Sequence, residues 1–96
     1  MSTVLIKQPG ETLPYAIDFT NLIPTGDSLS SVTSVTATPS GSGDLTLGSA
    51  SISGTQVQFR IGGGIEGKMY RVEAIVVTAV GNILEGDGRL FVTDRT

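Results

Sequence analysis

The feature that most constrains the fold of this chain is the alternation of apolar and polar residues in its last third. Between residues 69 and 93, two runs place a small or apolar residue at every second position, and Val80-Gly81-Asn82 separates the runs. Side chains of a β-strand point alternately to the two faces of a sheet, so a period of two predicts strands with one buried face. No stretch of eleven or more residues carries the apolar spacing of a helix. Gly or Pro interrupts the chain at short intervals. We therefore predict an all-β protein.

The register of this last hairpin is predicted by matching its two apolar faces. A three-residue loop at 80–82 places Val72 opposite Leu90 on the shared apolar face. The same register places Glu73 opposite Arg89 on the other face, which predicts an ion pair there. A slip of one residue would mix the two faces, so the alternation argues against it.

The outer face of the predicted hairpin combines charged residues with more apolar ones than a solvated sheet face usually carries. Two interpretations remain open: a loop or the N-terminal arm covers the apolar residues, or they form a surface for a partner protein. The arm carries the apolar run Val4-Leu5-Ile6, which can add as a strand to the last strand of its own domain or to an edge of another subunit. The candidate partner interface consists of Val4, Leu5, Ile6, Ile75, Val77, Ile83 and Phe91.

The rest of the chain supplies further short strands with turn residues between them. A two-residue loop, Ser53-Gly54, predicts a second hairpin in which Ile52 lies opposite Thr55. About seven strands at this spacing predict an immunoglobulin-like antiparallel β-sandwich over residues 13–94, after an extended N-terminal arm at residues 1–12. The two hairpins would belong to different sheets, with the loop 62–67 crossing between them. The strands predicted before the last hairpin are residues 15–20, 29–38, 45–47, 49–52 and 55–61.

The composition excludes several classes of function. The chain has 96 residues, which is the size of one small domain, and it contains no Cys, His or Trp. Without Cys and His, a Ser-His-Asp or Cys-His catalytic group, the usual zinc sites and a disulfide are all excluded. The formal net charge is −3, so we expect no basic surface for nucleic acid or for an anionic membrane. We expect a protein that is not an enzyme, has no cofactor or metal, and binds another protein.

The loop GGGIEG at 62–67 matches a dinucleotide-binding glycine pattern, and with Lys68 it matches most of a phosphate-loop pattern. Both patterns need a helix after the glycines, because backbone amides at a helix N-terminus hold the phosphate. Here the following residues alternate like a strand, and Met69 replaces the hydroxyl residue that reaches the metal ion. Glu85 and Asp87 are close in sequence, but they face outward on a strand and belong to no calcium-loop pattern. We therefore expect neither nucleotide nor calcium binding.

A series of short segments along the chain also carries a family resemblance. The opening segments are Lys7-Gln8-Pro9, Tyr15-Ala16-Ile17-Asp18-Phe19 and Gly26-Asp27-Ser28-Leu29. The later segments are Ser51-Ile52-Ser53-Gly54-Thr55, Gly62-Gly63-Gly64 and Tyr70-Arg71-Val72. In their order and spacing they resemble the small fibre-tail adaptor proteins of tailed bacteriophages, over nearly the whole chain. Phe19 stands where those proteins commonly carry Trp.

The resemblance implies a non-catalytic structural protein of the virion that docks other virion proteins at the tail or neck, at a fibre-tail or head-tail junction. It implies several copies or a homo-oligomer, found in the virion and, during assembly, in the host cytoplasm. Two alternatives remain. Small immunoglobulin-like domains also serve as capsid decoration or cement proteins. An immunoglobulin-like carbohydrate-binding module would instead stack host-surface sugars on Phe91, the one aromatic residue expected on an outer face.

Overall fold

The computed structural model describes residues 4–94, and within this range the chain consists of strands, turns and loops without a helix. This confirms the all-β class that the alternation predicts. The eight strands are β1 (Val4–Lys7), β2 (Leu13–Asp18), β3 (Leu29–Thr38), β4 (Leu45–Leu47), β5 (Ser51–Ser53), β6 (Gln56–Gly63), β7 (Met69–Thr78) and β8 (Ile83–Val92).

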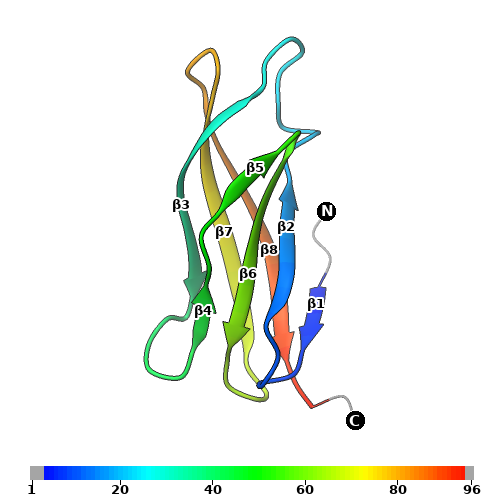
Figure 1. The fold of residues 1–96 in the computed structure, drawn as a ribbon, viewed down its shortest axis with the longest axis vertical. Helices are drawn as coiled ribbons and strands as arrows, with labels where there is room; N and C mark the ends of the chain where they lie inside the picture. The colour runs from blue at the N-terminus through cyan, green and yellow to red at the C-terminus, as the bar shows by residue number, and fades with distance from the viewer. Residues whose placement is uncertain (1–3, 95–96) are drawn as a thin grey trace.

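The strands form two packed sheets (Figure 1). One sheet has the order β1-β8-β7-β3, and the other has the order β2-β6-β4, with β5 also paired to β6. The two hairpins, β5-β6 and β7-β8, therefore lie in different sheets as predicted, and residues 64–68 cross between them. The neighbours β3-β7-β8 and β2-β6-β4 are compatible with an immunoglobulin sandwich, whose sheets contain the strands C-F-G and B-E-D.

The N-terminal segment forms an additional strand of the sandwich. β1 runs parallel to β8, with Val4 opposite Arg89 and Lys7 opposite Val92. In Figure 1, β1 lies at the edge of the molecule, beside β8. Of the two roles left open for the arm, pairing with the last strand of its own domain is the one present in this structure. Because β1 extends the sheet, residues 4–7 do not cover the outer faces of β7 and β8.

The register of β7 and β8 differs by two residues from the predicted one. Glu73 lies opposite Asp87, so the prediction that it faces Arg89 is wrong. The loop comprises residues 79–81, and Gly81 has a φ of 94°, the left-handed conformation that glycine adopts at the end of a three-residue hairpin loop. A shift of two residues leaves every side chain on its predicted face, so the alternation does not distinguish the two registers.

The register of β5 and β6 also differs from the prediction. Ile52 lies opposite Val57, and not opposite Thr55. The two-residue loop is therefore Gly54-Thr55, with Gly54 at its first position and a φ of 61°. Glycine is preferred at that position of a hairpin turn because the backbone there is left-handed.

The core lies between the sheets, and two glycines of β8 let the sheets approach closely. A Cβ atom at Gly86 would lie 2.9 Å from Cγ2 of Ile17, and one at Gly88 would collide with the hydroxyl group of Tyr15. Side chains of β2 therefore occupy space that side chains of β8 would otherwise fill. The buried apolar residues are Ile17, Phe19, Ala37, Val57, Phe59, Ile61, Tyr70, Val72, Ala74, Val76, Leu90 and Val92.

Candidate functional site

The outward side chains of β1, β8 and β7 form one continuous surface, which we call the outer face. It is the side of their sheet that points away from β2, β6 and β4, because the alternate residues of β7 and β8 are buried in the core. The strand registers arrange it in rows across the sheet. From the C-terminal to the N-terminal end of β8, the rows are Ile6-Phe91-Met69, Arg89-Arg71, Asp87-Glu73, Glu85-Ile75 and Ile83-Val77. Apolar residues thus lie at both ends, with charged residues between them.

The first apolar end contains Ile6, Phe91 and Met69. Ile6 is 45% exposed and Met69 is 48% exposed, while Phe91 between them is half-buried. Ile6 and Phe91 were among the predicted interface residues, but Met69 was not. The predicted register, with Glu73 opposite Arg89, would place Arg71 opposite Phe91, whereas the observed register places Met69 there. Counting the alternation back from Tyr70 would have assigned Met69 to the outer face.

The second apolar end contains three predicted residues, Ile75, Val77 and Ile83. Val77 lies opposite Ile83, which is 71% exposed, and Ile75 lies two residues before Val77 on the same side of β7. Ile75 and Val77 are half-buried. The β7-β8 loop follows directly and exposes Val80. The structure therefore brings these predicted residues together at the end of the sheet that carries this loop.

Between the two ends, Arg71 is the centre of a charged network. Its Nε donates a hydrogen bond to Oδ2 of Asp87 at 2.8 Å, and its Nη2 donates one to Oε2 of Glu73 at 3.2 Å. The hydrogen bond and charge of Asp87 raise the pKa of Arg71. These ion pairs replace the predicted pair of Glu73 with Arg89. Exposed ion pairs of this kind stabilise a fold little.

The remaining predicted interface residues lie elsewhere. Leu5 is half-buried and packs against the core, on the inner side of β1. The backbone of Val4 pairs with Arg89, but its side chain lies outside what the structure describes. The outer face thus contains Ile6 from the apolar run of the arm, while Leu5 helps to attach the arm to the sandwich.

Lys7 fixes the end of β1 and therefore the position of Ile6. Its side chain is fully buried, and its Nζ donates hydrogen bonds to the carbonyl oxygens of Gln8 at 2.7 Å, Pro9 at 3.4 Å and Gly63 at 2.5 Å. Burial lowers the pKa of the Lys7 ammonium group, although the charge of Glu11 opposes this effect. Because Gly63 belongs to β6, Lys7 joins β1 to the opposite sheet. No sequence pattern indicates this burial, since lysine is rarely buried.

A second polar cluster fixes the start of β7, next to Met69. The Tyr70 hydroxyl donates a hydrogen bond to Oδ1 of Asp44 at 2.5 Å and accepts one from the backbone N–H of Ile65 at 3.0 Å. Nζ of Lys68 donates to the same Asp44 oxygen at 3.1 Å. The hydrogen bond from Tyr70, followed by that from Lys68, lowers the pKa of Asp44. A tyrosine that binds backbone a few residues upstream at this corner is also typical of immunoglobulin sandwiches.

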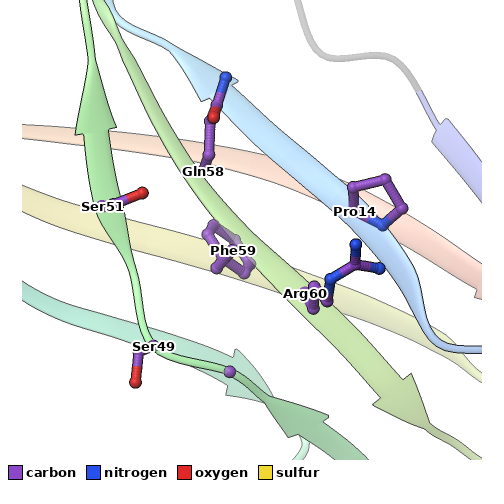
Figure 2. Close-up of a pocket in the computed structure, with 7 residues that line it drawn as sticks. Pro14, Ser49, Ser51, Gln58, Phe59 and Arg60 are labelled. Atoms are coloured by element: carbon purple, nitrogen blue, oxygen red, sulfur yellow. The ribbon is translucent and has the colours of Figure 1, made fainter.

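The outer side of the other sheet contains an open depression of about 410 Å³ (Figure 2). Residues 48–50 of the edge segment stand opposite Phe59 and Arg60, so this edge has one extra residue and bulges away from β6. Arg60 is the one charged residue of the lining, and Phe59 is only 4% exposed. The lining contains no carboxylate, and its one aromatic ring is buried, so it offers no exposed ring for stacking against a sugar. The lining residues are Pro14, Gly48, Ser49, Ser51, Gln58, Phe59 and Arg60.

Within residues 4–94, no group of three or more His, Cys, Asp or Glu side chains is placed to hold a metal ion. The described part of the chain also has no helix that is long and apolar enough to cross a membrane. The glycine-rich segment is followed by strand β7, as predicted, so its amides do not form the helix N-terminus that phosphate binding requires. The outer face, with exposed apolar residues at both ends, is the candidate functional site.

The fold and this surface define the class of the protein: a small two-sheet β domain that presents a sheet face with apolar ends and a charged centre. The family model described as Podophage GP4 fiber-tail adaptor protein gp77 matches residues 7–90. The chain belongs to this family, which confirms the resemblance found in the sequence. A comparison with curated proteins finds no match.

Proposed function

We propose that this protein is a non-catalytic structural component of a phage virion, and that it joins a fibre to the tail through protein-protein contacts of the outer face. The family description supports the joining role. Contact through the outer face is supported by the exposed apolar side chains at both of its ends. Ile83 is 71% exposed, Met69 48% and Ile6 45%. Exposed apolar residues that gather on one surface mark sites of protein interaction.

The charged centre of the outer face supports the same proposal. Arg71 forms hydrogen bonds to both Glu73 and Asp87. A partner therefore has to match an ordered set of charges as well as two apolar ends, and such complementarity selects one partner over others. The proposal includes several copies of the protein per virion, arranged with the closed symmetry that most oligomers have. Assembly would take place in the host cytoplasm.

The two alternative functions have no comparable support. Phe91 is half-buried in a row with Ile6 and Met69, so it does not offer the free ring face that stacks against a sugar. A decoration protein would also use an exposed sheet face, but the family description names a fibre-tail adaptor. The position of this protein on the particle therefore distinguishes an adaptor from a decoration protein.

The proposal predicts that a charge at either apolar end prevents fibre attachment. Phage lacking this protein would be grown in cells that supply wild type, Ile83→Asp or Met69→Asp, and the fibre protein on purified particles would be measured by immunoblot. We expect particles with either variant to carry at least about tenfold less fibre protein than particles with wild type. The reason is that an unpaired carboxylate buried in an apolar contact is strongly unfavourable.

The matched control is Leu22→Asp, since Leu22 is 48% exposed but lies in the β2-β3 loop, outside the outer face. All three substitutions are at exposed positions, so each should change the free energy of unfolding by only about 0.5 kcal/mol. Full fibre retention by both outer-face variants would show that this face is not the attachment surface. Signal from a labelled copy over the shell would identify a decoration protein instead.

A further inference from the structure

Most edges of the two sheets are irregular, short or interrupted by proline, which hinders pairing with another strand, whereas one regular segment carries only charged side chains for this purpose. β2 contains Pro14, which has no backbone N–H to donate. β3 has two irregularities in its register with β7, and the β4-β5 edge bulges at residues 48–50. β1 is only four residues long and covers β8 from Arg89 to Val92. Residues 83–88 of β8 thus form an edge that is regular and that no described strand pairs.

The backbone groups at this open edge are oriented for pairing. In a β-strand, successive residues direct their N–H and C=O groups to opposite sides. The N–H of Thr93 donates to Lys7 in β1, whereas the carbonyl of Asn82, at the other end of the hairpin, accepts from Thr78 on the β7 side. The backbone N–H and C=O groups of the odd-numbered residues of β8 therefore point away from β7. Ile83, Glu85 and Asp87 direct both backbone groups to the open edge.

The side chains around the edge indicate what kind of strand fits. On the outer side, Glu85 and Asp87 are exposed, and Asp87 already forms an ion pair with Arg71 on its β7 side. On the inner side, Gly86 and Gly88 have no side chains, and the apolar residues of β2 come close beneath them. A strand added here would place one set of side chains beside two carboxylates and the alternate set beside apolar groups. Opposite charges and apolar contacts on the respective sides would stabilise the pair.

We infer that residues 83–88 of β8 accept an extended segment of the partner protein, with alternating apolar and basic residues, as an additional strand of the sheet. Strand addition of this kind obtains affinity from main-chain hydrogen bonds and specificity from alternate side chains. A second copy of this chain fits less well, because antiparallel pairing of two β8 strands would bring Glu85 and Asp87 of both copies together, and like charges destabilise a pair. The inference rests on the proposed function, since it names a second contact for the same partner.

The test uses the full chain and an eight-residue peptide of alternating valine and lysine. Amide hydrogen exchange is measured by NMR with and without the peptide. We expect the amides of Ile83, Glu85 and Asp87 to exchange about tenfold more slowly when the peptide is bound. The amides of Leu84 and Gly86 already pair with β7 and should change little. A peptide with the same composition in two blocks, four valines followed by four lysines, is the control for non-specific attraction to an acidic protein.

Two variants separate backbone pairing from charge. Glu85→Pro removes an edge-facing N–H without removing a hydrogen bond to β7, so it should abolish the slowed exchange. Where this variant proves unstable, Glu85→Lys should bind the valine-lysine peptide at least about fivefold more weakly and favour an alternating valine-glutamate peptide.

Equal peptide affinity in Glu85→Pro, or binding without slower exchange at the three edge amides, would overturn the inference. So would a dimer, formed without peptide, that protects the same amides, because the occupant would then be a second copy. A failure in this test leaves the outer-face proposal intact, since fibre retention by Met69→Asp concerns side chains away from this edge. Loss of fibre in Glu85→Pro particles, with Glu85→Gln as the control, would connect the two contacts.

Discussion

The hydrogen bond from Tyr70 to Asp44 joins the start of β7 to the loop before β4. Tyr70 is fully buried, so water cannot replace its partner. The donors around Asp44 lower its pKa from the ordinary value of 3.8, with Tyr70 as the main cause. A carboxyl group with a lowered pKa binds protons more weakly in the folded state than in the unfolded state. Its contribution to stability is therefore present above the ordinary pKa and is lost as the pH falls through the folded-state pKa.

We expect the free energy of unfolding of the wild type to decrease as the pH is lowered below about 4, and to decrease less in Asp44→Asn. Tyr70→Phe keeps the carboxylate but removes its main donor, so it should also weaken the acid dependence. Urea titrations at neutral and acidic pH measure these differences. Some acid dependence should remain, because hydrogen bonds chiefly from Thr20 and Thr78 lower the pKa values of Asp18 and Asp27. Identical pH profiles for the wild type and Asp44→Asn would contradict this explanation.

Lys7 shows why a sequence pattern does not predict polar residues that join distant segments of the chain. Its position after the apolar run of the arm is typical of a residue that returns the chain to solvent. Three carbonyl oxygens surround it instead, and one of them belongs to Gly63, 56 residues away in sequence. Asp44 likewise meets Tyr70 across 26 residues, from a loop without periodicity. Alternation predicts which face a side chain occupies, but it carries no information on contacts between distant segments.

At the level of strands, β8 depends on glycine where β2 crosses beneath it. Gly86 and Gly88 face inward and alternate with Glu85 and Asp87, so the strand is charged on one side and has no side chains at these positions on the other. The space beneath Gly86 is filled by Ile17 and Phe19. An inward methyl group on β8 would therefore meet a packed core.

We expect Gly86→Ala to lower the free energy of unfolding by about 1–3 kcal/mol, as overpacking of a core usually does. Its Cβ atom would lie 2.9 Å from both Cγ2 of Ile17 and Cζ of Phe19. Gly88→Ala meets the hydroxyl end of Tyr15, so combining it with Tyr15→Phe should recover part of its loss. Gly10→Ala is the control, because nothing lies within 4 Å of its added Cβ atom. Denaturant titrations measure all four variants, and equal stabilities of Gly86→Ala and Gly10→Ala would refute the packing argument.

The strands themselves were largely predictable, while their registers were not. Alternation along β7 and β8 correctly assigned Val72, Leu90 and their neighbours to the core. It left open a shift of two residues, which the left-handed Gly81 at the end of the loop decides. The same uncertainty affected β5 and β6, where Gly54 begins the loop. In both hairpins, the glycine conformation sets the register, and the sequence shows only that a glycine is present.

For the whole molecule, the outer face combines a local and a non-local pattern. Ile75, Val77 and Ile83 lie on neighbouring strands of one hairpin, so alternation alone placed them together. The row of Ile6, Phe91 and Met69 requires β1 to pair in parallel with β8; the apolar run of the arm indicated this pairing as one of two possibilities, but not its direction or register. The charged residues between these ends complete a surface that spans the sheet. We propose that this surface meets another virion protein where fibre and tail join.

A cryo-electron-microscopy reconstruction of the particle, at a resolution that separates the two sheets of this domain, tests that claim most directly. We expect density of another virion protein against the outer face, in contact with Ile83 and Met69, at the junction of fibre and tail. We also expect the opposite sheet, which contains the depression beside Arg60, to remain open to solvent at this junction. A reconstruction in which the outer face is bare, or in which the domain lies on the capsid shell, would contradict the account.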